Sequence, residues 1–181
     1  MKYFWGFFLL CYVDAQSIVL KKHPYATLGV DTYLTASTST GDLDNDGDID
    51  IVVANGRHWS QFNQVFYNDG KGFYRRSSLL GAEANTSYMA LAADIDNDGD
   101  LDLYVTRAGQ GGGETAFNRG RFLEYQSKNS KFVDVTTLKG LENRDHFDTF
   151  GTAFLDYNND GNLDLLTTQG WTIAESGKTE I

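Results

Sequence analysis

The chain has 181 residues, a net charge of −10 and one cysteine, Cys11. Such an acidic composition argues against nucleic acid as a partner, because a phosphate backbone is bound mainly by basic residues. The length allows one ordinary domain with a sizeable core, and one cysteine excludes a framework of intrachain disulfides. The fold must therefore be held by core packing, by metal or by both.

The N-terminal segment has the pattern of a secretory signal peptide. Lys2 is followed by an apolar run, Tyr3–Val13, and then by small residues ending at Ala15. The run is too short to span a membrane, which takes ~20 residues, so we predict cleavage after Ala15 and export. The expected location is secreted, cell-surface or periplasmic. Two alternatives are a buried core helix and lipid attachment at Cys11, although Leu10 replaces the small residue normally required before such a cysteine.

Three acidic stretches of nine residues organise the rest of the chain: Asp42–Asp50, Asp94–Asp102 and Asp156–Asp164. Each has glycine at its sixth position, and together they carry 13 of the 25 acidic residues. Carboxylates at this spacing repel one another by roughly 1 kcal/mol per pair even in water, so the pattern indicates a bound cation. Oxygen ligands at alternating positions around a glycine turn suit Ca²⁺ better than Mg²⁺.

The expected ligands follow from the position in each loop. The first, third, fifth and ninth residues supply side chains, and the seventh supplies its backbone carbonyl. The predicted sets are Asp42, Asp44, Asp46, Asp50 and the carbonyl of Asp48; Asp94, Asp96, Asp98, Asp102 and the carbonyl of Asp100; and Asp156, Asn158, Asp160, Asp164 and the carbonyl of Asn162. We predict up to three Ca²⁺ sites, with the third the weakest, because asparagines lower its charge.

An EF-hand loop begins with the same pattern and is the main alternative. It requires a glutamate at the twelfth position, where this chain has Val53, Val105 and Thr167. Runs of β-type residues, rather than helical patterns, flank each loop. The sequence therefore excludes an EF-hand. An acidic turn without metal is the alternative that stays open for each loop.

The loops belong to a longer repeat. Their first aspartates are offset by 52 and 62 residues, a period typical of propellers and arrays. Each complete unit has four strand-like runs, two around the acidic loop and two around a polar turn, which predicts a four-stranded antiparallel propeller blade. We predict an all-β fold, a partial β-propeller of two and a half blades. After the signal peptide at 1–15 come a lead-in at 16–33, blades at 34–84 and 85–145, and an incomplete blade at 146–181 with a polar tail, Glu175–Ile181.

These residues resemble a known family. The Asp-x-Asp-x-Asp-Gly-x-x-Asp loops between β-strands resemble the FG-GAP/VCBS repeats of integrin-α-like propellers. Phe132-Val133-Asp134-Val135-Thr136, Gly140-Leu141 and Gly151–Asp156 are similar to the ASPIC/UnbV and cartilage-acidic-protein group. The resemblance implies a seven-bladed propeller with structural Ca²⁺ sites that serves as a binding platform outside the cytoplasm. Because this chain has fewer blades, we expect either missing blades in a longer protein or a second chain to close the propeller.

We predict a non-catalytic binding or adhesion platform for an extracellular protein or glycan. The three histidines come without a Gly-x-Ser-x-Gly context, and no catalytic constellation is evident. The alternatives are the accessory segment of a secreted hydrolase or lyase and a structural spacer. Trp59 and Trp171 are either exposed ligand anchors or packed between blades, and Asn85 is either a glycosylation acceptor or an ordinary turn residue.

Overall fold

The protein is built from antiparallel β-sheets. The computed structural model describes residues 12–14, 17–19, 28, 32–57, 59–77, 80, 84–107, 120–141, 149–169 and 178–180. Within these residues the regular structure is β-strand except for one 3-10 turn, Ser127–Asn129. None of them forms a helix of the length and apolar character needed to cross a membrane.

Three sheets carry the architecture. The first has the order β3-β4-β6-β7, with bounds Thr35–Gly41, Asp50–Asn55, Gln64–Asn68 and Tyr74–Ser77. The second has the order β12-β11-β10-β9, with bounds Lys131–Asp134, Arg121–Gln126, Asp102–Arg107 and Ser87–Ala93. The third has the order β13-β14-β15, with bounds Thr149–Leu155, Asp164–Gln169 and Lys178–Glu180.

Two small pairs complete the described strands. Strands β1 and β2, Tyr12–Asp14 and Ser17–Val19, pair with each other on either side of the predicted cleavage position. Strands β5 and β8, Gln61–Phe62 and Ala84–Asn85, link the first sheet to the start of the second. The cleavage prediction itself is not tested by this pairing.

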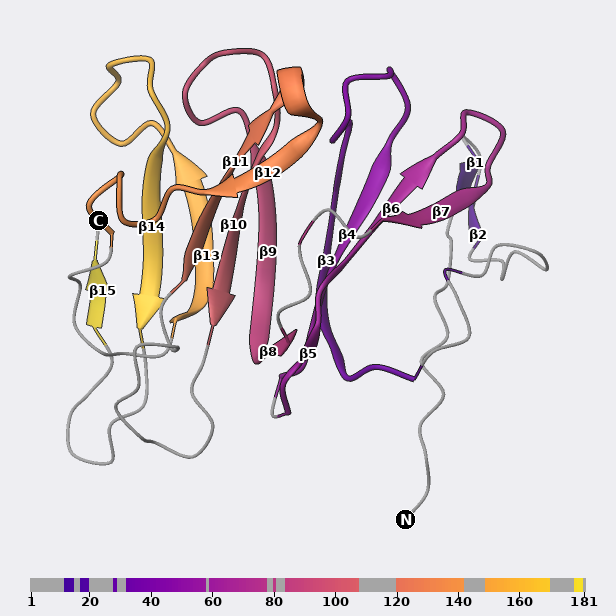
Figure 1. Ribbon diagram of the computed structural model, residues 1–181, viewed down its shortest axis with the longest axis horizontal. Helices are drawn as coiled ribbons and strands as arrows, with labels where there is room; N and C mark the ends of the chain where they lie inside the picture. The colour runs from indigo at the N-terminus through magenta and orange to yellow at the C-terminus, as the bar shows by residue number, and fades with distance from the viewer. Residues whose placement is uncertain are drawn as a thin grey trace.

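The three sheets stand side by side in chain order, with all three acidic loops at one edge (Figure 1). Each acidic loop joins the first two strands of its sheet, so the ends of β3, β9 and β13 and the starts of β4, β10 and β14 meet at this edge. The fold prediction is confirmed: this is an all-β arrangement of antiparallel blades of the propeller type.

The core lies between neighbouring sheets. Alternate residues of a strand point to opposite faces, and β4 and β10 are buried on both faces. Val52 and Ala54 of the first sheet pack with Leu103 and Val105 of the second. Tyr104, from the other face of β10, packs towards the third sheet. Burial on both faces explains why these strands read as continuous apolar runs rather than an alternating pattern.

The sequence did not predict β15. Its residues lie in the polar tail Glu175–Ile181, where no hydrophobic pattern marks a strand, yet Lys178–Glu180 pairs with Thr167–Gln169. An edge strand is held by backbone hydrogen bonds, so its side chains need not carry an apolar pattern. The third sheet therefore extends further than the single hairpin that the sequence predicted.

Candidate metal centres

All three acidic loops share one backbone conformation. Positive φ values occur at the fourth and sixth positions of each loop: Asn45 (58°) and Gly47 (92°), Asn97 (60°) and Gly99 (92°), Asn159 (58°) and Gly161 (86°). Asparagine and glycine are the residues that adopt this left-handed conformation most readily. The two tight turns bring the alternating carboxylates to one side of the loop.

The first aspartate of each loop is held by the backbone. In the first loop the two carboxylate oxygens of Asp42 accept hydrogen bonds from the N–H groups of Asp46 (3.0 Å) and Gly47 (2.9 Å). Asp94 and Asp156 accept the same pair of bonds in their own loops, at 2.9–3.1 Å. These bonds fix the carboxylate in place independently of any metal.

The ninth aspartate connects the first two loops to the rest of their blades. Asp50 is fully buried, and its two oxygens accept from the N–H groups of Leu43 and Asn68, both at 2.8 Å. Asp102 does the same with Ile95 (3.4 Å) and Tyr125 (2.9 Å). Asn68 and Tyr125 lie on β6 and β11, in the second hairpin of the blade. The sequence predicted these aspartates as ligands but did not reveal this tie.

The structure gathers two groups of carboxylates. Asp42, Asp44 and Asp50 offer oxygens that all lie within 4.8 Å of one another, and so do Asp94, Asp96 and Asp98. Both groups could hold a metal ion. Of the other predicted acidic ligands in the described residues, Asp46 and Asp102 lie outside these groups, and the third loop forms no such group from Asp156, Asp160 and Asp164.

Burial and mutual repulsion disfavour charge in the first group. Asp44 Oδ1 is buried without a hydrogen-bond partner, and burial together with the charges of Asp50, Asp46 and Asp42 raises the pKa of this carboxyl. Burial also raises the pKa of Asp50, even though two backbone N–H groups lower it. A bound cation would remove this cost, because it favours the ionised form of a carboxylate.

In the second loop burial raises the pKa of Asp102 to about 6. The third loop behaves differently. The hydrogen bond from the N–H of Asn162, with a further one from the Asn158 side chain, holds the pKa of Asp160 below its usual value. The charge of Asp160 is therefore already stabilised by neutral donors, whereas Asp44 of the first loop has a buried oxygen without a hydrogen-bond partner.

The comparison with known families bears on these loops directly. Residues 42–105 match the family described as FG-GAP-like repeat. The match covers about a third of the chain. The match runs from the first aspartate of the first acidic loop, through the first sheet and the second acidic loop, to Val105 in β10. No curated protein matches the chain. The finer grouping with ASPIC/UnbV and cartilage-acidic proteins stays a prediction.

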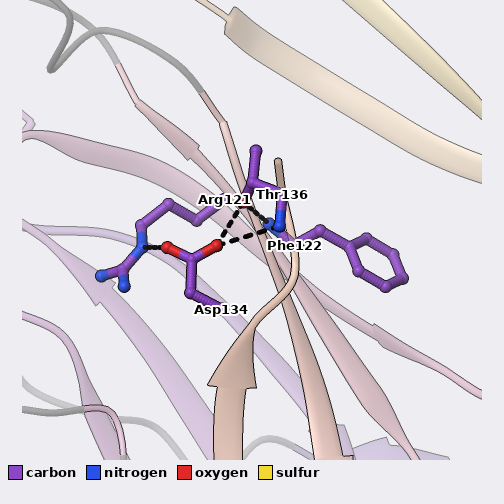
Figure 2. A network of polar contacts seen from close by, with 4 residues as sticks. All are labelled: Arg121, Phe122, Asp134 and Thr136. Atoms are coloured by element: carbon purple, nitrogen blue, oxygen red, sulfur yellow. Dashed lines mark hydrogen bonds and ion pairs between the residues drawn. The ribbon is translucent and has the colours of Figure 1, made fainter. Parts of the chain in front are cut away.

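The Phe-x-Asp-Val-Thr motif has a structural role beside the FG-GAP-like repeat. Asp134 forms an ion pair with Arg121 Nε (2.6 Å) and accepts hydrogen bonds from the backbone N–H and Oγ1 of Thr136 (Figure 2). Thr136 Oγ1 in turn accepts from the N–H of Phe122 (2.9 Å). Burial alone would raise the pKa of Asp134, but these bonds hold it below its usual value. The motif ties the end of β12 to the start of β11.

Trp59 lies at the other end of the first sheet. The acidic loop precedes Asp50 at the start of β4, whereas Trp59 follows its end at Asn55. Trp59 is 67% exposed, and Phe62 and Leu34 of the same region are also exposed. Trp59 is therefore not packed between the sheets of the described chain. Trp171, the side chain of Asn85 and the histidines lie outside the described residues and side chains.

Proposed function

We propose that this protein is an exported, Ca²⁺-binding, non-catalytic platform for protein or glycan ligands. The observation that carries the metal part is Asp44 Oδ1, a buried carboxylate oxygen without a hydrogen-bond partner among other carboxylates. Leaving such an oxygen unpaired costs free energy, and a cation in the loop supplies the missing partner. Export rests on the signal-peptide pattern at residues 1–15.

Ca²⁺ fits these loops better than other common cations. The donors are carboxylate oxygens, which suit hard divalent ions, and the loops offer more of them than Mg²⁺ usually takes from protein. In the first loop Asp42, Asp44 and Asp50 would hold the ion, and in the second Asp94, Asp96 and Asp98. A Ca²⁺ at each position would offset two of the negative charges of its loop, and in the first loop it would also tie Asp42 at the start of the loop to Asp50 at its end.

The third site is proposed as the weakest. Asn158 and Asn162 replace carboxylates, and Asp160 is already stabilised by hydrogen bonds from both of these asparagines. Fewer charges and fewer unsatisfied oxygens lower the affinity for Ca²⁺. The third loop therefore depends on metal less than the first two loops do.

An exposed residue beside the third sheet indicates a further packing partner. The second residue of each loop shows this. Leu43 in the first loop is buried between the first two sheets, and Ile95 in the second loop packs between the second and third sheets. Tyr157 has the same position in the third loop and is 62% exposed. We therefore propose that further blades or a second chain pack against the third sheet.

Asp44 provides the direct test of the metal proposal. Asp44→Asn removes one charge from the first group and is expected to weaken Ca²⁺ binding to the first loop about tenfold or more, since affinity follows the ligand charge. Isothermal titration of the full chain measures this change. Asp69→Asn removes the same charge from an exposed polar turn, where N–H groups of Lys71 and Phe73 already satisfy the carboxylate. It should change the affinity only a few-fold, and equal losses in both variants would contradict the assignment.

Trp59 provides the test of the platform. Because its side chain is exposed, Trp59→Ala should change the free energy of unfolding by less than ~0.5 kcal/mol. A screen of glycans and matrix proteins in Ca²⁺ first identifies a ligand of the wild type. Trp59→Ala should bind that ligand more weakly. Phe73→Ala, at another exposed aromatic residue in the loop between β6 and β7, is the matched control. A screen without a Ca²⁺-dependent ligand would favour a structural spacer instead.

A further inference from the structure

Neighbouring acidic loops touch one another through their side chains. The amide of Asn45, at the fourth position of the first loop, donates to Asp100 Oδ1 at the seventh position of the second. The amide of Asn97, at the fourth position of the second loop, donates to Asn162 Oδ1 at the seventh position of the third (3.3 Å). The same pair of positions is therefore joined at both interfaces between blades.

Packing also holds the first two loops together beneath the Asn45–Asp100 bond. Leu101, one residue after Asp100, lies against Gly41 at the base of the first loop, where an added Cβ would be 2.5 Å from its Cδ1. The positive φ of Asn45 and Asn97 directs both side chains out of their own loops in the same way. The contact between fourth and seventh positions is thus a product of the repeat rather than of one loop.

The contact between the first two loops joins residues that flank their carboxylate groups. Asn45 stands between Asp44 and Asp46, so its position follows that of the first group. Asp100 is buried, and its N–H donates to Asp98 Oδ1, a member of the second group (2.9 Å). A change in the first loop that moves Asn45 is therefore transmitted through Asp100 to Asp98.

We propose that Asn45 and Asn97 are positioning residues that couple adjacent loops, so that Ca²⁺ in one loop raises the affinity of the next. This inference rests on the proposed Ca²⁺ binding. Because such coupling is reciprocal, each loop would assist the other equally. The metal would then order the whole loop edge of the chain rather than three independent turns.

The side chain of asparagine can be separated from its backbone role. Asn45→Gly keeps a residue that accepts positive φ and leaves the net charge unchanged, but removes the amide. Asn159→Gly makes the same change in the third loop, where the described residues place no further acidic loop beside it. Asn45→Asp combined with Asp100→Asn restores a hydrogen bond in the opposite direction, again without a change in net charge.

Calorimetric Ca²⁺ titration of the full chain tests the coupling. We expect positive cooperativity between the first two loops in the wild type, and in Asn45→Gly an affinity about fivefold weaker with the cooperativity lost. Asn159→Gly should leave both quantities unchanged, and the Asn45→Asp/Asp100→Asn pair should restore them to within about twofold of the wild type.

Two results would overturn the coupling. If the wild type binds Ca²⁺ but Asn45→Gly behaves like Asn159→Gly, or if the exchanged pair is no better than Asn45→Gly, the coupling is wrong while the Ca²⁺ sites stand. If the wild type binds no Ca²⁺, the coupling and the proposed sites fail together.

Discussion

Replacing Asp50 by alanine is expected to lower the free energy of unfolding by about 2–4 kcal/mol, measured by urea unfolding in EDTA. The substitution leaves the N–H groups of Leu43 and Asn68 without their acceptor in a fully buried position. Each unsatisfied buried donor costs about 1–3 kcal/mol, and removing an unfavourable buried charge returns part of this cost. EDTA separates this structural effect from any effect of metal.

Asp164→Ala is the matched control for Asp50→Ala. Asp164 has the same position in the third loop and accepts from the N–H of Tyr157 (2.9 Å), but it is only partly buried. Its loss should cost about 1 kcal/mol, because water can reach the freed donor. If the two variants lose the same stability, the ninth aspartate does not tie the loop to the second hairpin.

The sequence predicted the repeat because its signals are local. The acidic loops and the β-type runs that flank them are contiguous, and each run lies within a residue or two of an observed strand. Leu101, Leu103 and Val105 share one core cluster, and Asp102 lies on the opposite face, as strand periodicity alone requires. Hairpin topology needed no information beyond these segments.

The remaining features depend on neighbours far away in the chain. The ties from Asp50 to Asn68 and from Asp102 to Tyr125 join residues 18 and 23 positions apart, and the Asn45 to Asp100 contact spans 55. In the sequence, asparagine at the fourth position of a loop is fully accounted for by the left-handed turn conformation it adopts. Its contact with the next loop therefore could not be predicted. The exposure of Trp59 likewise depends on which distant segments the fold brings near it.

The pH dependence of stability without metal is the second large effect that we expect. Burial raises the pKa of Asp102 from 3.8 to about 6, so between these values the folded chain holds a proton that the unfolded chain has released. Stability in EDTA should therefore fall as the pH rises from about 4 to about 6, by about 3 kcal/mol for this group alone. The raised pKa values of Asp44 and Asp50 act in the same direction.

Other carboxyls oppose this trend at lower pH. The lowered pKa values of Asp134 and Asp160 give stability above their unfolded pKa that is lost as the pH falls through their folded values. The melting temperature in EDTA should thus be highest near pH 4–5. Asp102→Asn removes the titrating group and should flatten the decline towards pH 7, and an unchanged decline would show that other groups cause it.

Thermal melting of the full chain at pH 7 in Ca²⁺ and in EDTA is the most direct test of the central claim. At about 100 times the dissociation constant each site adds ~2.7 kcal/mol to the folded state. Two filled loops should therefore raise the melting temperature by roughly 10 °C or more, at about 2–4 °C per kcal/mol for a chain of this size. The gain should shrink as the pH falls towards 4, because protons compete with Ca²⁺ for the carboxylates. Equal melting temperatures in Ca²⁺ and EDTA at pH 7 would contradict the account.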